Sequence, residues 1–141
     1  MTTPMITQVH PTEKLPTASG ESVSVDVELV PVIRALQALD LHTLMCCQDV
    51  GEAMAGGGMW PLPDRWHTFL SGYAWLKMPV DAAQALLAKL SETPEFESRL
   101  TAKAPGGWQS QVWLGPTGLA DYANIYFPRE QIPDLTAALT A

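Results

Sequence analysis

The segment at residues 67–78 alternates between two kinds of side chain and then gives way abruptly to a helical pattern. Small or aliphatic residues and aromatic residues hold alternate positions, which is the period of two that a β-strand requires. From Pro79 onward the apolar residues recur at the spacing of an amphipathic helix. The chain must therefore place a long strand directly before a helix. One face of that strand suits packing against helices because its residues are small or aliphatic, namely Leu70, Gly72, Ala74, Leu76 and Met78.

Shorter patterned segments flank this strand and helix. Helical spacing of apolar residues predicts three further helices, at residues 32–40, 94–100 and 133–140. Alternation or short apolar runs predict four further strands, at residues 23–27, 41–47, 108–114 and 124–127. Asp26 fits either the end of the first strand or the cap of the first helix. The mixture predicts an α+β protein with a small, mostly antiparallel sheet covered on one face by helices. A ferredoxin-like arrangement is one version of this architecture.

The chain is long enough for one domain. Its 141 residues match a single unit, which we expect to span residues 23–141. Residues 1–22 contain proline, serine and threonine without apolar periodicity, so they predict a flexible leader. Residues 53–65 contain Gly56, Gly57, Gly58, Pro61 and Pro63 and predict a long loop. Loops of that length are lids, binding loops or disordered segments.

Charge and cysteine content exclude several classes of protein. The formal net charge of −7 makes the average surface repel phosphate backbones, so a nucleic-acid partner is not expected. No apolar run reaches the roughly 20 residues that cross a bilayer, and residues 1–20 lack a secretion signal. Cys46 and Cys47 are adjacent and cannot staple distant parts of a fold. These features predict a protein of the cytoplasm without a membrane partner.

Two stretches carry a resemblance to known sequences. Residues 43–52 read T-L-M-C-C-Q-D-V-G-E, and Trp66 and residues 72–79, G-Y-A-W-L-K-M-P, follow. These stretches, about the central third of the chain, resemble a loose group of small uncharacterised proteins from high-GC bacteria and their phages. The resemblance implies a protein of a phage or an accessory genome, and it implies no activity.

The aromatic face of the long strand is the first candidate binding surface. A flat aromatic surface can stack against a nucleobase or another planar ligand. The alternative is that the same face is buried in the core or in a homodimer, where aromatic residues are also enriched. The loop at residues 53–65 could close over this surface with Met54, Met59 and Trp60. The candidate residues on the strands are Phe69, Tyr73, Trp75, Lys77, Trp113 and Tyr126.

The turn after the two cysteines is the second candidate. Cys47, Asp49 and Glu52 are close in sequence there, and His42 and His67 could approach if strands pair. Alternation along a strand lets only one of the two thiols face the core. A nucleophilic thiol needs a nearby cation, a histidine or a helix N-terminus, and a free cysteine is more commonly a small buried apolar residue. No recognised zinc-ligand spacing occurs, so no metal is expected, and a bond between the two adjacent thiols would strain the backbone.

These observations rank three functions. The first is a non-catalytic protein, present as a homo-oligomer and requiring no cofactor, that binds a small planar ligand or a protein partner through the aromatic face and the loop. It comes first because the sequence offers no convincing catalytic constellation. The alternative is a small enzyme dependent on cysteine or metal, centred on Cys46, Cys47, Asp49, Glu52 and His67. A third is an assembly subunit whose exposed aromatic residues lie at interfaces.

Overall fold

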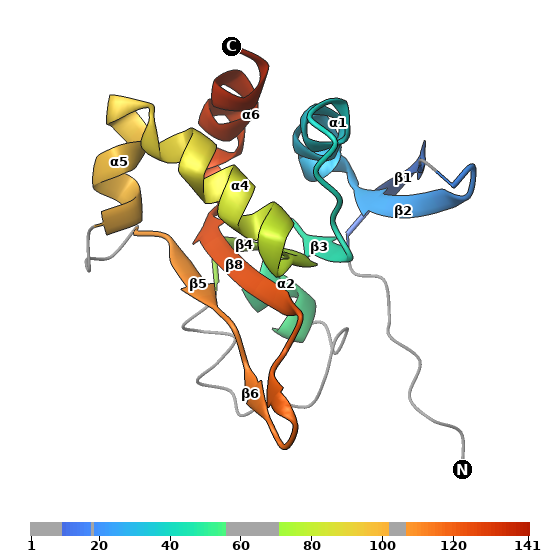
Figure 1. The fold of residues 1–141 in the computed structure, drawn as a ribbon. Coiled ribbons are helices and arrows are strands. Elements are labelled where there is room, and N and C mark those ends of the chain that lie inside the picture. Colours follow the sequence, from blue (N-terminus) through green and yellow to red (C-terminus); the bar gives the residue numbers. More distant parts are fainter. Residues whose placement is uncertain (1–9, 18, 56–70, 102–106) are drawn as a thin grey trace.

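A four-stranded antiparallel sheet forms the centre of the molecule (Figure 1). Its strands lie in the order β3 (Met45–Cys47), β4 (Tyr73–Pro79), β8 (Tyr122–Pro128) and β5 (Gln109–Gln111). This computed structural model describes residues 10–17, 19–55, 71–101 and 107–141. The predicted α+β class is confirmed. A ferredoxin-like arrangement is not confirmed, because the strands of this sheet and the helices between them do not follow the order β-α-β-β-α-β along the chain.

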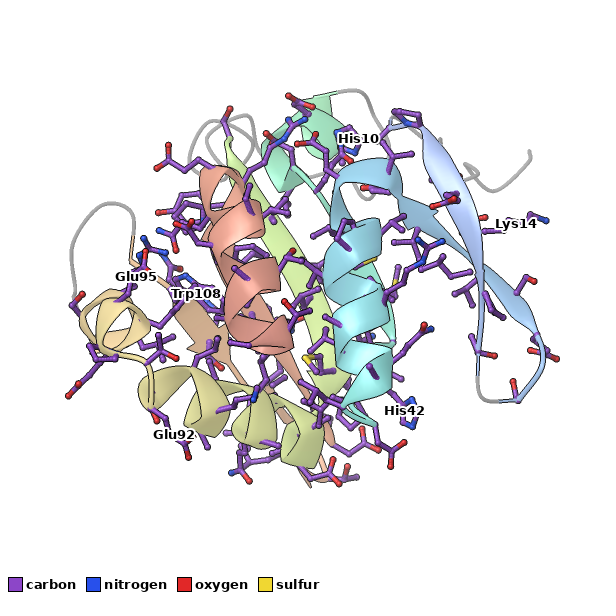
Figure 2. The ribbon with its side chains drawn as sticks, turned by 90° about the horizontal axis from the view of Figure 1, so that it is seen from above. His10, Lys14, His42, Glu92, Glu95 and Trp108 are labelled. Atoms are coloured by element: carbon purple, nitrogen blue, oxygen red, sulfur yellow. The ribbon has the colours of Figure 1, made fainter. Side chains whose placement is uncertain are left out.

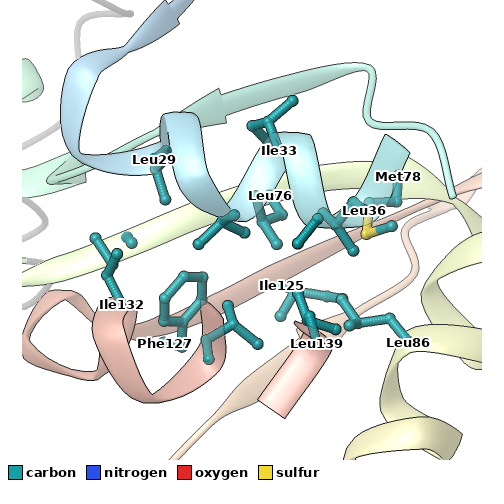
Figure 3. Packing of buried hydrophobic residues seen from close by; sticks show 14 of the residues in the cluster. Leu29, Ile33, Leu36, Leu76, Met78, Leu86, Ile125, Phe127, Ile132 and Leu139 are labelled. Atoms are coloured by element: carbon teal, nitrogen blue, oxygen red, sulfur yellow. The ribbon is translucent and has the colours of Figure 1, made fainter. Parts of the chain in front are cut away.

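Helices cover one face of the sheet and enclose the main core (Figure 1). They are α1 (Val30–Ala38), α4 (Val80–Ser91), α5 (Pro94–Thr101) and α6 (Ile132–Thr140). The aliphatic positions of β4 point toward them, as the alternation predicted. Figure 3 shows Leu76, Ile125 and Phe127 from the two central strands packing against Leu36 of α1 and Leu139 of α6. All three of those strand side chains are fully buried.

The opposite face of the sheet is covered in part by a short helix, α2 (Val50–Ala55), which lies directly after β3. Cross-strand pairing places Cys47 beside Trp75 and Trp75 beside Tyr126. Cys47, Trp75 and two α2 residues, Val50 and Ala53, form a second small core. Residues 53–55 are therefore helical, although the sequence predicted a loop there. The remaining residues of that predicted loop, 56–65, lie outside the described part of the chain.

An antiparallel hairpin precedes the first helix. It consists of β1 (Thr12–Pro16) and β2 (Ser22–Asp26). Leu15 and Val25 are both buried in the main core. Regular structure thus begins ahead of Val23, within the segment that sequence assigned to an irregular leader. The pattern missed β1 because Leu15 is its single buried apolar side chain, so no alternation reveals the strand.

Two strands end in the same sequence of elements. β2 passes through a 3-10 turn, η1 (Val27–Leu29), into α1, and β8 passes through η2 (Arg129–Gln131) into α6. Each helix carries a proline in its first turn, where a missing N–H costs nothing. Helices α1 and α6 lie side by side over the sheet (Figure 2). Both 3-10 turns therefore end up at the same end of the molecule.

The remaining elements differ from the sequence pattern mainly in length. The predicted strand at residues 41–47 is reduced to Met45–Cys47, and the one at residues 108–114 is divided between β5 and β6. β6 (Leu114–Gly115) and β7 (Gly118–Leu119) form a separate hairpin that projects away from the sheet (Figure 1). Leu114 and Leu119 in this hairpin are mostly exposed. Within the described residues, no helix is long and apolar enough to cross a bilayer.

Candidate functional site

A groove of about 1110 Å³ opens at the end of the molecule where the two 3-10 turns meet. Its walls come from η1 and α1, the start of β4, the end of β8, η2 and α6. Most of the lining is apolar, with charged residues from the two 3-10 turns. The lining residues are Glu28, Pro31, Gly72, Tyr73, Pro128, Arg129, Glu130, Ile132, Pro133, Thr136 and Ala137.

Arg129 joins this groove to a cluster of carboxylates behind it. Its Nη1 donates to Asp49 Oδ2 at 3.3 Å and to Glu52 Oε1 at 2.9 Å. Its Nε donates to Glu28 Oε1 at 3.2 Å, and its Nη2 contacts the other oxygen of Glu28. These bonds, with that to Glu28 strongest, raise the pKa of the guanidinium above its already high ordinary value. Arg129 is therefore a fixed positive charge that holds η1, α2 and η2 together.

Asp49 is the most deeply buried of these carboxylates, at 3% exposure. Its Oδ1 accepts the N–H of Glu52 at 3.0 Å at the start of α2. Its Oδ2 accepts the N–H of Gly72 at 3.1 Å. Gly72 has a φ of +79°, in the left-handed region that disfavours side chains. Asp49 therefore fixes the entry to β4 as well as the guanidinium of Arg129.

A buried histidine extends the cluster toward the N-terminal hairpin. His10 lies just before β1 and is 7% exposed. Its Nδ1 lies 3.2 Å from Asp26 Oδ2, and its Nε2 lies 2.9 Å from Glu52 Oε2. The hydrogen bond with His10, and to a smaller degree the charge of Arg129, lowers the pKa of Glu52. Glu52 thus links the histidine to the arginine.

Asp26 and Gln48 complete the connections between β2, β3 and η1. Asp26 stands at the cap position of η1 but makes no capping hydrogen bond there. Its Oδ2 instead accepts the N–H of Gln48 at 2.9 Å. The Gln48 side chain accepts the N–H of Glu28 at 3.1 Å and donates to the Glu28 carboxylate at 2.8 Å. The Asp26 carboxylate is thereby turned away from the helix and toward His10.

The cluster carries an excess of negative charge. Three carboxylates, those of Glu28, Asp49 and Glu52, bond to the one guanidinium, and the Asp26 carboxylate lies beside His10. Carboxylates therefore outnumber the guanidinium by three. Charges of one sign at such short range repel strongly when they are partly buried. This end of the molecule therefore favours cations over anions.

The two cysteines occupy opposite sides of β3. The Cys47 thiol faces the cluster, with Sγ 3.9 Å from His10 Nδ1, whereas Cys46 packs against the main core. Burial raises the pKa of each thiol to about 12. Both are therefore protonated at neutral pH, unlike an activated nucleophile. His42 is exposed and lies at the other end of α1 from His10 (Figure 2), and His67 lies outside the described residues.

The aromatic candidates do not form one exposed surface in the structure, because some are buried or half-buried and Trp113 lies apart from them. Trp75 is 4% exposed and its Nε1 donates to Asn124 Oδ1 at 2.9 Å, so it belongs to the second small core beneath α2. Tyr73 and Tyr126 are half-buried beside it, and burial raises the pKa of Tyr126. Lys77 lies over the ring of Tyr122 at 4.1 Å. Trp113 is 59% exposed near the projecting hairpin, and Trp60 and Phe69 lie outside the described residues.

The sequence thus pointed to Cys47, Asp49, Glu52 and Tyr73 at this end of the molecule and missed their partners. His10, Glu28 and Arg129 were not selected because they lie 39, 21 and 80 positions from Asp49. One pattern in the sequence could have indicated Glu28 and Arg129. In both places a strand is followed by a short turn and then by a helix with proline in its first turn. Comparison of the chain with protein-family models, curated proteins and solved structures gives no match.

Proposed function

We propose that this chain is a non-catalytic binding protein whose groove holds a small molecule with an apolar body and a cationic group. The proposal rests on one observation: the groove is mostly apolar, and carboxylates are in excess at one end of it. Ligand sites in proteins are concave and mostly apolar, with a few polar groups that fix orientation. The groove between η1, β4 and α6 has that composition.

The apolar part of the groove suits a rigid, flat or branched body. Pro31, Pro128, Ile132 and Pro133 belong to this wall. Prolines and the first turns of helices lose little conformational freedom when a ligand binds, so the wall is largely preformed. Tyr73 adds an aromatic side chain that is half-buried at the start of β4. An aromatic ring attracts a cation as well as an apolar group.

The charged end of the groove determines which sign of charge a ligand can carry. Glu28 and Glu130 line the groove together with Arg129. The Arg129 guanidinium is already shared among Glu28, Asp49 and Glu52, so its charge is compensated from behind the groove. An ammonium or guanidinium group would find an excess of carboxylates, and a carboxylate ligand would be repelled by them.

Binding is favoured over catalysis by the state of the reactive groups. Both thiols are protonated at neutral pH. The Asp49 carboxylate is committed to backbone N–H groups and to Arg129, which holds a structure in place rather than accepting a proton from a substrate. The charge pattern is therefore used to orient a ligand.

A matched set of probes tests this proposal. 2-Phenylethylamine, 2-phenylethanol and 3-phenylpropanoate share an aromatic body and differ in charge. We expect the amine to bind the full chain at least about tenfold tighter than the other two at pH 7 and low salt, which is about 1.4 kcal/mol. Isothermal titration calorimetry measures the three affinities. Equal affinities, tighter binding of the carboxylate, or no binding at all would contradict the proposal.

Two pairs of variants place the binding in the groove. Ala137→Trp fills the groove from an exposed position of α6, and Ala88→Trp makes the same change on an exposed position of α4. Glu130→Gln removes a charge from the lining, and Glu92→Gln removes one from an exposed position elsewhere. We expect Ala137→Trp to abolish binding of the amine and Glu130→Gln to weaken it. Retained binding in Ala137→Trp, or an equal loss in Ala88→Trp, would place the ligand elsewhere.

A further inference from the structure

We propose that His10, Asp26 and Cys47 form a binding site for a divalent transition-metal ion, with Zn²⁺ the favoured ion. Their nitrogen, oxygen and sulfur atoms all lie within 4.8 Å of one another. The three residues come from the segment before β1, the end of β2 and β3, so the fold and not a sequence motif brings them together. This site lies behind the acidic end of the groove and does not depend on what the groove binds.

The separations between these atoms fit a tetrahedral ion. Ligand atoms about 2.0 to 2.3 Å from a tetrahedral zinc lie about 3.3 to 3.6 Å from one another. His10 Nδ1 lies 3.2 Å from Asp26 Oδ2 and 3.9 Å from Cys47 Sγ. Only small side-chain movements would bring all three atoms to bonding distance of one ion.

The environment of His10 calls for a cation at this position. Each ring nitrogen faces a carboxylate oxygen, Nδ1 that of Asp26 and Nε2 that of Glu52. A protonated imidazole donates to both carboxylates, so the ring already stands where the protein accommodates a positive charge. A metal ion bound at Nδ1 in place of that proton would bond to Asp26 as well and leave the Nε2 N–H to donate to Glu52. The surplus of carboxylates over the single guanidinium in the surrounding cluster favours the same cation.

Glu52 is placed to position the histidine. Metal-bound histidines commonly donate the other ring N–H to a carboxylate, which fixes the ring and strengthens the ligand. Nε2 of His10 lies 2.9 Å from Glu52 Oε2, and Arg129 holds the other oxygen of Glu52 at 2.9 Å. Glu52 therefore acts through His10 and is a positioning residue.

The donor set favours zinc over magnesium or calcium. Imidazole and thiolate suit Zn²⁺ and other transition metals, whereas magnesium and calcium require oxygen ligands. On binding, the Cys47 thiol bonds to the metal through sulfur and releases its proton to solvent. Three protein ligands leave one position of a tetrahedral ion for water.

Cobalt(II) is the probe that tests the site, because its absorption reports both geometry and ligand type. The full chain is titrated with Co²⁺ under a thiol-free reductant. We expect one ion per chain, a visible absorption typical of tetrahedral cobalt, and a near-ultraviolet charge-transfer band from a thiolate. Zn²⁺ should displace the cobalt and remove both bands. A wild-type chain that gives no charge-transfer band would overturn the proposal.

The adjacent cysteine provides the matched control. Cys47→Ser should remove the charge-transfer band, and Cys46→Ser should retain it because Cys46 packs on the other side of β3. Asp26→Asn keeps the side-chain shape and should weaken Zn²⁺ binding by more than about 100-fold, since loss of an outer partner alone costs about 10 to 100-fold. Glu52→Gln should weaken it within that smaller range while the band persists.

Folding of each variant is checked by circular dichroism and thermal melting. If Cys47→Ser does not fold, Asp26→Asn carries the test, since Zn²⁺ should raise the melting temperature of the wild type and not of this variant. His42→Gln, at an exposed histidine, should leave binding unchanged. A band that persists in Cys47→Ser, a band lost in Cys46→Ser, or an equal rise in melting temperature for wild type and Asp26→Asn would each overturn the proposal.

Discussion

The helix-covered face of the sheet and the end where the two 3-10 turns meet are stabilised in different ways. Against the helices, Leu76, Ile125 and Phe127 are fully buried among other apolar side chains. At the other region, His10 and Asp49 are buried beside charged partners. Apolar contacts are non-directional, whereas a buried charge is stable only while each partner stays in place.

The comparison shows which of the two regions contains charged contacts that the stability of the fold does not require. An apolar packing of the same volume would stabilise a domain at least as well as a buried ionic network. The network at η1, α2 and η2 therefore joins three elements, although stability alone does not require charged side chains there. Variants on the two sides should separate these two kinds of stabilisation.

Removal of a large side chain from the main core should have the largest effect. Phe127 is fully buried and stacks on Trp108, with ring centroids 4.7 Å apart. Phe127→Ala should lower the free energy of unfolding by about 3 to 5 kcal/mol because it leaves a cavity. Urea denaturation followed by circular dichroism measures the loss. A loss below about 1 kcal/mol would show that this side of the sheet is loosely packed.

A change in the second small core should cost less, and it tests a polar contact among apolar ones. Trp75→Phe keeps an aromatic ring but removes the N–H that bonds to the buried Asn124. We expect a loss of about 1 to 3 kcal/mol from the unpaired amide and the smaller ring. Trp113→Phe, at an exposed tryptophan, should change stability by less than about 0.5 kcal/mol. Equal effects of the two substitutions would contradict the burial of Trp75.

Removal of the central charge of the network should be milder and should depend on salt. Arg129→Met removes the partner shared by Glu28, Asp49 and Glu52. We expect a loss of about 1 to 2 kcal/mol at pH 7, less than for a fully buried pair because Arg129 is 28% exposed. The loss should shrink in high salt if carboxylate repulsion causes it. Arg34→Met, at an exposed arginine, is the control and should cost less than about 0.5 kcal/mol.

The smallest effect should come from Glu52 and should depend on pH. Its pKa is lowered in the folded chain, so its ionised form stabilises the fold above its ordinary pKa of about 4.3, and this contribution is lost as pH falls through the lowered value. Glu52→Gln should therefore be less stable than wild type at pH 7, by less than about 1 kcal/mol. The two should converge in acid. Thermal melting from pH 7 to pH 3, with a chelator present, measures the difference in melting temperature between wild type and Glu52→Gln. A difference that stays constant over this range would contradict the prediction.

The sequence predicted the elements of the helix-covered face, because their apolar residues recur at regular spacing along the chain. The alternation from Tyr73 onward, the proline that ends β4 and the apolar spacing of α4 correspond to observed elements. The strand was predicted from residue 67, however, and β4 begins only after a turn at Gly72. The helix that begins at Pro94 and the C-terminal helix also lie where predicted. These elements are specified by side chains that are neighbours along the chain, so a short window of sequence contains the information.

The candidate site could be predicted only in part, for a physical reason. Cys47, Asp49 and Glu52 lie within six residues and were recognised together. His10 was not, because a histidine in a polar segment has no periodic signal that predicts burial. The sequence left Trp75 between a binding surface and a buried core, because α2, with a glycine at its second residue, gave no clear helical pattern to cover it.

The contacts of Arg129 also bear on the order in which the molecule assembles. Its bonds to Glu28 and Glu52 span 101 and 77 positions of the chain. Contacts between such distant segments repay the entropy of closing the loop only after the intervening elements have formed. The cluster should therefore appear late in folding, and a partly folded chain that already contains β4 and α4 would not yet present it.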